Sequence, residues 1–182
     1  VAAAVRRALT EETGSALVFL PGVGEIRRVE ERLQGIGADV DVAPLYGDLS
    51  PADQDRAIAP SAPSRRKVVL ATSIAETSLT IEGVRIVIDS GQMRVPKFSP
   101  RSGMTRLETV RVSQASADQR RGRAGRLEPG ICYRLWPEQA QRGLLPFTPP
   151  EILDADLAPL ALELAAWGKG DAASLPWLTQ PP

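Results

Sequence analysis

The chain has 182 residues, of which 43% are hydrophobic and 24% charged, and its 22 basic side chains balance its 22 acidic ones. This composition excludes a disordered tail and suffices for one complete hydrophobic core plus part of a second domain. The chain has no histidine and only one cysteine, Cys132. This excludes internal disulfides, imidazole-dependent triads and the common zinc sites. No signal peptide or membrane-spanning apolar run occurs, so we expect a cytoplasmic protein with no membrane partner.

Short apolar runs alternate with helical patterns along the chain. Helical spacing predicts helices over residues 2–12, 23–33 and 50–58, the last with Ser50 as N-cap and Pro51 in its first position. Apolar runs predict strands buried on both faces over residues 15–21, 67–72, 84–90 and 130–136, and residues 40–47 are expected to form a further strand. This alternation predicts an α/β fold with a parallel sheet covered by helices on both faces.

Ligands of open parallel sheets bind beyond the carboxyl ends of the strands, so the loops at those ends are candidate sites. The run from Thr72 to Thr80 follows one strand and is rich in hydroxyls. Ser73 and Glu76 fit a capping box, which predicts a short helix whose N-terminal amides bind an anion. The alternative is a cap that satisfies only its own backbone.

The stretch "QRRGRAGR", residues 119–126, concentrates arginines around two glycines, whereas lysine is absent from residues 99–168. We expect a short helix that begins at Ser113 or Ser116 and ends at Gly122. Gln119 and Arg123 then share one face and Arg126 follows, while residues 120 and 121 point elsewhere. Arginine binds phosphate oxygens bidentately, and glycine lets the backbone approach a ligand.

Two alternatives apply to this arginine-rich stretch. Ser116 and Gln119 also fit a capping box, which would occupy Gln119 with its own backbone. An isolated R-x-x-R pair is typical of a solvated basic face. The complete Q-R-x-G-R-x-G-R pattern is more specific, and it follows the Thr/Ser run in the order that a phosphate-handling site needs.

Four stretches of the sequence resemble DEAH-box helicases of superfamily 2. They are "LVFLPGVGEIRRV", "LYGDLSPADQDRAI", "ATSIAETSLTIEGVRIVIDSG" and "QASADQRRGRAGRLEPGICYRLW". These stretches are similar to motifs IV, V and VI of the second RecA-like domain in the bacterial HrpB type of ATP-dependent helicase. The resemblance covers nearly the whole chain and implies a RecA-like fold and ATP-dependent RNA helicase activity.

The resemblance also implies residue roles. Arg123 and Arg126 would be arginine fingers for the γ-phosphate of ATP, and Gln119 would place the attacking water or contact that phosphate. The other implied contacts are Ser78, Thr80, Glu82 and Ile58 to the nucleotide, and Thr72 and Ser73 to single-stranded RNA. Many relatives have Asn in place of Ser73, although a hydroxyl still reaches a phosphate. Ile58 replaces a base-stacking aromatic residue, which predicts weak base preference.

The phosphate-cradling loop G-x-x-x-x-G-K-[ST] and the D-E-A-H stretch are both absent. We therefore expect ATP and Mg²⁺ to be bound mainly by the first RecA-like domain of the same parent chain. The 182 residues alone are predicted not to hydrolyse ATP.

Between the motifs, Pro100 and Gly103 mark a turn that predicts a β-hairpin over residues 91–112. In the resembled family such a hairpin lies near the point of strand separation, so Arg94 and Arg106 are candidate nucleic-acid contacts. The alternative is a hairpin without function. We expect residues 1–149 to form the RecA-like domain and residues 150–182, with a short helical segment, to resemble the start of a winged-helix region.

The predicted function is the C-terminal RecA-like lobe of an ATP-dependent RNA helicase, which grips single-stranded nucleic acid. A second hypothesis is a non-enzymatic RNA-binding module that uses the basic patch only for affinity. A third is a DNA-directed helicase with the same motifs, because phosphate contacts do not distinguish the two nucleic acids.

Overall fold

The computed structural model describes residues 1–62, 64–77, 81–125 and 128–182. The expectations for Ser78, Thr80 and Arg126 fall outside these ranges and stay predictions. The chain divides into two compact units. The first unit comprises Val1–Met93 and Val110–Phe147, and the second comprises Arg94–Thr109 and Thr148–Pro182.

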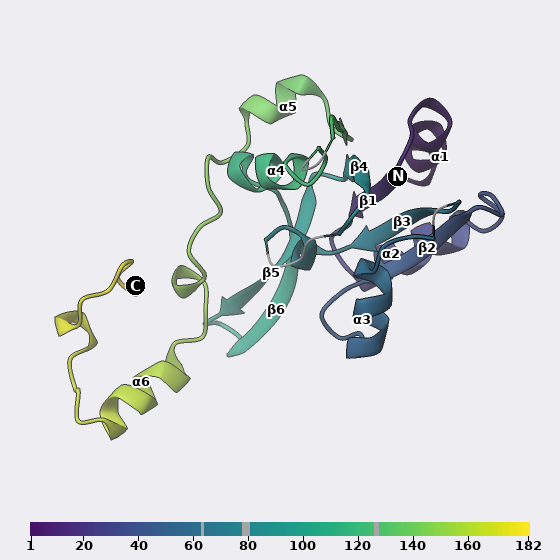
Figure 1. Cartoon of the computed structure of the whole chain (residues 1–182). Helices are drawn as coiled ribbons and strands as arrows, with labels where there is room; N and C mark the ends of the chain where they lie inside the picture. Colours follow the sequence, from purple (N-terminus) through teal and green to yellow (C-terminus); the bar gives the residue numbers. More distant parts are fainter. Residues whose placement is uncertain (63, 78–80, 126–127) are drawn as a thin grey trace. The chain divides into compact units, whose positions relative to one another are not determined.

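The first unit is built on a parallel sheet, which confirms the predicted fold class (Figure 1). Its strands run in the order β2-β3-β1-β4-β7. Their bounds are β1 Ser15–Phe19, β2 Val40–Leu45, β3 Arg66–Ala71, β4 Val84–Asp89 and β7 Ile131–Arg134. The helices of this unit are α1 Ala2–Glu11, α2 Val23–Arg32, α3 Pro51–Ile58, α4 Gln114–Arg121 and α5 Glu138–Arg142.

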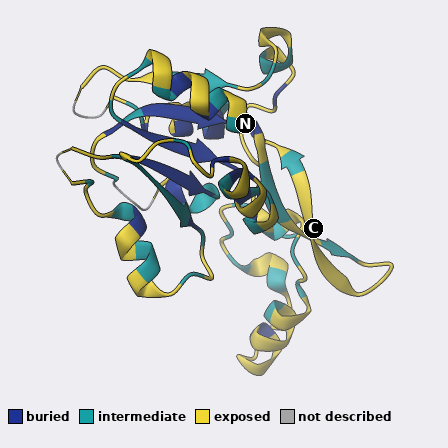
Figure 2. Ribbon diagram, turned by 90° about the vertical axis from the view of Figure 1, so that its right-hand side faces the viewer, coloured by how far each residue is buried: buried dark blue, intermediate teal, exposed yellow. Residues whose placement is uncertain are grey.

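Side chains of the central strands alternate between two hydrophobic layers, which is why the middle of each strand is apolar. On one face, Val68 and Leu70 of β3 pack with Val5 of α1 and Ile26 of α2. On the opposite face, the intervening strand residues pack with Ala57 of α3. Figure 2 shows the buried residues concentrated in these strands, with exposed residues on the outer sides of the helices.

The first two residues of β3 are basic, and they bind the ends of helices on opposite faces of the sheet. Arg66 donates from three nitrogens to the carbonyls of Leu9, Glu12 and Gly14 at 2.8, 2.9 and 2.8 Å, at the end of α1. Lys67 is 8% exposed, and its Nζ donates to the carbonyls of Arg56, Ala57 and Ala59 at 2.9, 3.4 and 2.6 Å, at the end of α3. Both cations neutralise the partial negative charge of a helix C-terminus.

The beginning of α3 follows its predicted chemistry. Ser50 is the N-cap, its hydroxyl oxygen accepts from the Asp53 amide at 3.2 Å, and Pro51 occupies the first helical position. These contacts confirm the expected helix over this segment. They orient α3 so that Ala57 reaches the sheet.

The predicted hairpin is confirmed as strands β5 Gln92–Ser99 and β6 Met104–Arg111, joined by a turn at Pro100–Gly103. The second unit holds the outer part of this hairpin, and the Phe98 amide donates to the Asp154 carbonyl at 2.8 Å. The unit also holds 3₁₀ turns at Glu151–Leu153 and Ala172–Ser174 and helix α6 Ala158–Ala166. Leu164 of α6 is buried, whereas Trp167, which follows this helix, is 73% exposed.

Candidate phosphate and nucleic-acid site

The candidate site lies where β1, β3 and β4 end, at Phe19, Ala71 and Asp89; we call this the carboxyl edge. The segment that leaves β3 forms a 3₁₀ turn over Ser73–Ala75 and makes no side-chain cap, so the predicted Ser73–Glu76 capping box is wrong. The Glu76 carboxylate instead contacts α4, at Ser116 and Arg120. A charge-assisted contact with a buried guanidinium is stronger than a local bond to the backbone, so the tertiary partner prevails.

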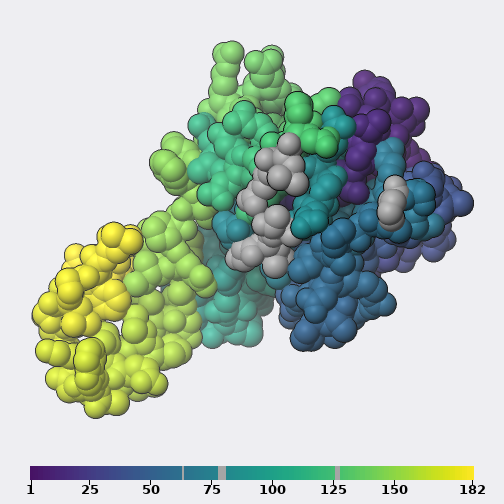
Figure 3. Space-filling view, viewed as in Figure 1, coloured from purple at the N-terminus to yellow at the C-terminus, as the bar shows by residue number. Residues whose placement is uncertain are grey.

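Helix α4 begins as one of the two predicted alternatives. Ser113 is its N-cap, and its hydroxyl oxygen accepts from the Ser116 amide at 3.1 Å. The Ser116 hydroxyl donates to Glu76 Oε2 at 2.9 Å, so the alternative capping box of Ser116 with Gln119 does not form. In the space-filling view, α4 and the segment after β3 lie side by side despite their separation in sequence (Figure 3).

Arg120 is the most deeply buried charged residue of α4, with no exposed surface. Its Nε donates to Glu76 Oε1 at 2.7 Å, and its Nη1 donates to Asp89 Oδ1 at 2.9 Å. The same Nη1 atom also donates to the carbonyl of Gln92, at the start of β5, over a distance of 3.1 Å. The guanidinium carbon lies 4.9 Å from the centroid of the Phe19 ring.

These contacts join the ends of β1 and β4, the turn after β3 and the start of β5 through one side chain. The Nη2 atom lies 2.6 Å from Glu76 Oε1, which is an ion pair by distance but lacks the alignment of a hydrogen bond. Arg120 was expected to point away from the site, so its role in joining these elements was not predicted. The signal was the spacing of Ser116 and Arg120, four residues apart on the face of α4 that also carries buried Ala117.

Arg123, a predicted arginine finger, follows α4 and is only 8% exposed. Its Nη2 donates to the backbone carbonyl of Glu76, so the guanidinium lies at the turn after β3. Gln119 is exposed on α4. The structure thus brings Arg123 to the carboxyl edge beside the Thr72–Glu76 segment, as the motif order suggested. A guanidinium carries five N–H donors in a planar fork, the geometry that matches phosphate oxygens.

The glycines after α4 serve the loop itself. Gly125 has a φ of +80°, and a Cβ built on Gly130 would lie 2.5 Å from the Gly125 backbone nitrogen. This close approach of two backbone segments requires glycine at both positions. Gly122 has an ordinary φ of −63°. Gly125 therefore allows its backbone to pass close to that of Gly130, and the expected approach to a ligand stays a prediction.

The other predicted contacts are spread over several elements. Thr72 and Ser73 are half-buried at the end of β3, and the Thr72 amide donates to the Leu45 carbonyl at 3.2 Å. Glu82 is exposed before β4, whereas Ile58 is half-buried and packs against the core on the α3 face. Arg94 is half-buried in β5 and Arg106 is exposed in β6, both in the second unit.

Burial changes the chemistry of the thiol in β7. Desolvation, aided by the nearby Asp89 carboxylate, raises the pKa of Cys132 to about 11. The thiol is therefore almost entirely protonated at neutral pH, which makes it a poor nucleophile and metal ligand.

Across the described ranges, no group of three or more carboxylate, thiol or imidazole side chains is arranged to bind a metal ion. Within these same residues, none of the helices has the length and apolar character needed to cross a membrane.

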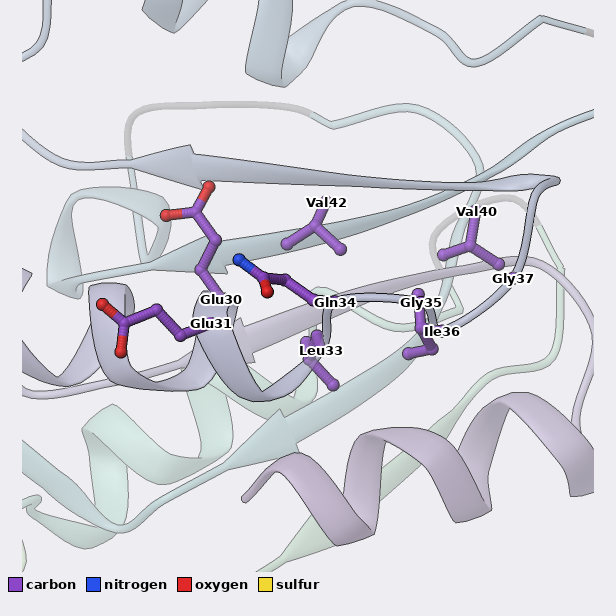
Figure 4. Close-up of a pocket in the computed structure, with 9 residues that line it drawn as sticks. All are labelled: Glu30, Glu31, Leu33, Gln34, Gly35, Ile36, Gly37, Val40 and Val42. Carbon is purple, nitrogen blue, oxygen red and sulfur yellow. The ribbon is translucent and has the colours of Figure 1, made fainter.

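A hollow of about 380 Å³ lies elsewhere, between the end of α2 and the start of β2 (Figure 4). Leu33, Ile36 and Val40 contribute its apolar lining, with the Glu30 and Glu31 side chains nearby. This hollow lies at the amino-terminal end of β2, where none of the predicted site residues occurs. It therefore does not belong to the carboxyl-edge site.

The sequence matches a known protein family. The model of the helicase conserved C-terminal domain matches residues 1–128. The chain belongs to the helicase conserved C-terminal domain family. Its RecA-like sheet and arginine-rich α4 segment are thus those of a helicase C-terminal domain.

Individual relatives of this helicase C-terminal domain support the DEAH-box resemblance. It is 58% identical to the Escherichia coli ATP-dependent RNA helicase HrpB over all of this chain and 23% of that protein. It is 42% identical to the human probable ATP-dependent RNA helicase DHX34, over 94% of this chain and 15% of that protein. A crystal structure of the E. coli DEAH/RHA helicase HrpB superposes with a TM-score of 0.95 at 55% identity, covering 100% of this chain and 23% of that one.

The chain spans less than a quarter of the length of these relatives. The resemblance to the bacterial HrpB type is confirmed by the identity and by the superposition.

Proposed function

We propose that this domain is the second RecA-like lobe of an ATP-dependent RNA helicase. In this role it completes an ATP site formed mainly by a first RecA-like domain of the same parent chain. The observation that carries the proposal is the position of Arg123, whose guanidinium contacts the turn after β3 at the carboxyl edge. Ligands of parallel α/β sheets bind at that edge. The names of the relatives support the same activity.

Arg123 supports a role with the triphosphate of ATP, because arginine binds phosphate oxygens bidentately. Arg123 and Arg126 would bind the γ-phosphate as arginine fingers, and exposed Gln119 would orient the attacking water. Ser78, Thr80, Glu82 and Ile58 are proposed to contact the nucleotide. Mg²⁺ would be held by the first domain, because the G-x-x-x-x-G-K-[ST] loop and the D-E-A-H stretch do not occur in this sequence. When bound, the ion neutralises charge on the phosphates.

Arginine fingers act by stabilising the charge that spreads over the transferred phosphoryl group. Such a residue contributes a factor of about 10³ to 10⁵ in turnover, which corresponds to roughly 4–7 kcal/mol of barrier. Lysine lacks the planar fork, which is consistent with the exclusive use of arginine in this stretch. Because the fingers act on ATP held elsewhere, the 182-residue chain alone is proposed not to hydrolyse it.

Single-stranded RNA is the proposed partner at the same edge. Thr72 and Ser73 would bind its phosphates from the end of β3. Arg94 and Arg106 of the hairpin, in the second unit, are proposed separately as nucleic-acid contacts. We also propose that residues 1–149 are the RecA-like domain, that residues 150–182 begin a winged-helix region, and that the protein is cytoplasmic. A DNA-directed helicase is distinguished by comparing stimulation of ATP turnover by RNA and by DNA.

The decisive experiment measures RNA-stimulated ATP hydrolysis and RNA binding by the full-length protein that carries this chain. Arg123→Ala is expected to lower turnover by about three orders of magnitude with RNA affinity nearly unchanged. Arg121→Ala is the matched control, because Arg121 is exposed and its nearest acid, Asp118, lies 3.6 Å away. Unchanged turnover with weakened RNA binding in Arg123→Ala would instead establish the non-enzymatic binding module.

A further inference from the structure

Glu76 accepts hydrogen bonds from three residues in or just after α4, through both its carboxylate and its backbone carbonyl. Its carboxylate accepts from Ser116 at 2.9 Å and from Arg120 at 2.7 Å. Its backbone carbonyl accepts from Arg123. The same residue closes the turn after β3, because the Glu76 amide donates to the Ser73 carbonyl at 2.9 Å. One residue therefore contacts both the proposed RNA-binding turn and the proposed arginine finger.

We propose that Arg120 and Glu76 are positioning residues that couple RNA binding at the turn after β3 to the placement of Arg123. This inference rests on the proposed function and states how RNA binding would control the position of the arginine finger. A movement of Thr72 or Ser73 on binding a strand is passed to Glu76 through the backbone hydrogen bonds of the turn. The Glu76 carbonyl then carries that movement to the Arg123 guanidinium.

Burial makes this linkage stiff. Arg120 and Asp89 have no exposed surface, and Glu76 is half-buried. Breaking the ion pairs would leave uncompensated charge away from water, which is strongly unfavourable. Helix α4 and the turn are therefore expected to move together rather than separately. The Gln92 carbonyl, which also accepts from Arg120 at 3.1 Å, adds the start of β5 to the same group.

Arginine is required at position 120 by geometry as well as by charge. Its Nε and Nη1 atoms point to two different carboxylates, Glu76 at 2.7 Å and Asp89 at 2.9 Å. A lysine carries one nitrogen and cannot reproduce this fork. Arg120→Lys thus keeps the charge and loses the linkage. Glu76→Gln removes the carboxylate and keeps the backbone carbonyl that binds Arg123.

The test compares ATP turnover with and without single-stranded RNA in the full-length protein, together with the RNA Kd, the KM for ATP and thermal unfolding. In Arg120→Lys and Glu76→Gln we expect the ratio of stimulated to unstimulated turnover to fall at least about fivefold. The RNA Kd and the KM for ATP should stay within about threefold of wild type, since neither residue is assigned to bind a ligand. Arg121→Ala, on the exposed side of the same helix, should keep the wild-type ratio.

Several outcomes would overturn the coupling role. One is an unchanged ratio of stimulated to unstimulated turnover in a folded variant. Another is a fall in this ratio that weaker RNA binding fully explains. If both variants fail to fold, Ser116→Ala, which removes only one hydrogen bond to Glu76, decides the question: a wild-type ratio rejects the coupling. Wild-type turnover that RNA does not stimulate would reject the proposed function itself, and the coupling with it.

Discussion

Replacing Arg66 by alanine should destabilise the domain far more than replacing its neighbour Arg65. Arg66 makes three charge-assisted hydrogen bonds of 2.8–2.9 Å to carbonyls at the end of α1, and burial lowers the pKa of its guanidinium. Each such bond is worth about 1.5–3 kcal/mol when its partner is left without water. Water can reach part of this half-buried site, so we expect a total loss of about 2–4 kcal/mol rather than the full sum.

Arg65 supplies the matched control. It pairs with Asp41 at the surface, where the two side chains are 38% and 46% exposed, and it donates to the Ala38 carbonyl at 2.9 Å. The Arg65 guanidinium lowers the pKa of the Asp41 carboxyl through their hydrogen bonds. Exposed ion pairs contribute about 1 kcal/mol or less. Arg65→Ala should therefore destabilise the domain far less than Arg66→Ala.

The assay is urea unfolding of the 182-residue chain, followed by tryptophan fluorescence and circular dichroism. Arg66→Ala should lower the midpoint with little change in m-value, and its Tm should fall by roughly 5–15 °C, at about 2–4 °C per kcal/mol for a domain of this size. Arg66→Lys, which keeps the charge but only one nitrogen, should lie between the two. Equal and small losses for Arg65→Ala and Arg66→Ala would refute the claim that Arg66 stabilises the end of α1.

Three further predictions concern individual sites. Gly91→Ala places a Cβ 2.6 Å from Trp136 Cε3 at a φ of +75°, and should cost about 2–4 kcal/mol; a Tm within one degree of wild type would contradict this. Cys132, with a pKa of about 11, should carry roughly two orders of magnitude less thiolate at pH 8 than a free cysteine, so its alkylation by iodoacetamide should be correspondingly slow. Because the folded state holds the thiol proton more tightly, wild type should lose more stability than Cys132→Ala as pH rises from about 9 to 11. Ser50→Ala removes the N-cap of α3 and should lower the free energy of unfolding by about 1 kcal/mol, measured by the same urea titration.

The centre of the sheet could be predicted from the sequence because β1, β3 and β4 are buried on both faces and therefore carry nearly continuous apolar runs. The double burial expected for residues 130–136 is wrong, because β7 lies at an edge of the sheet and Ile131 is 40% exposed. Local signals that the structure confirms, such as Ser50 before α3 and the turn between Pro100 and Gly103, could also be predicted. These features depend on neighbouring residues only. Arg123 could be placed at the carboxyl edge because the motif order was recognisable.

The partners of Glu76 could not be predicted in this way. A serine three residues before a glutamate fits a capping box, yet Glu76 binds Arg120, which lies 44 residues further along the chain. Sequence patterns favour exposure of arginine, and they do not show which carboxylates will bury one. The buried ion pairs with Asp89 and Glu76 depend on strand order and helix placement. They became visible only in three dimensions.

The contact between Arg66 and α1 determines where a shorter version of this domain can be cut for expression. A fragment that begins at Ser15 would keep every strand of the sheet, yet it would remove the carbonyls of Leu9, Glu12 and Gly14 that Arg66 binds. It would also uncover apolar side chains of β1 and β4, the strands that α1 contacts. Such a fragment should be poorly soluble, whereas one that retains residues 1–14 should remain folded. Helix α1 is thus an integral part of the domain and not a removable linker.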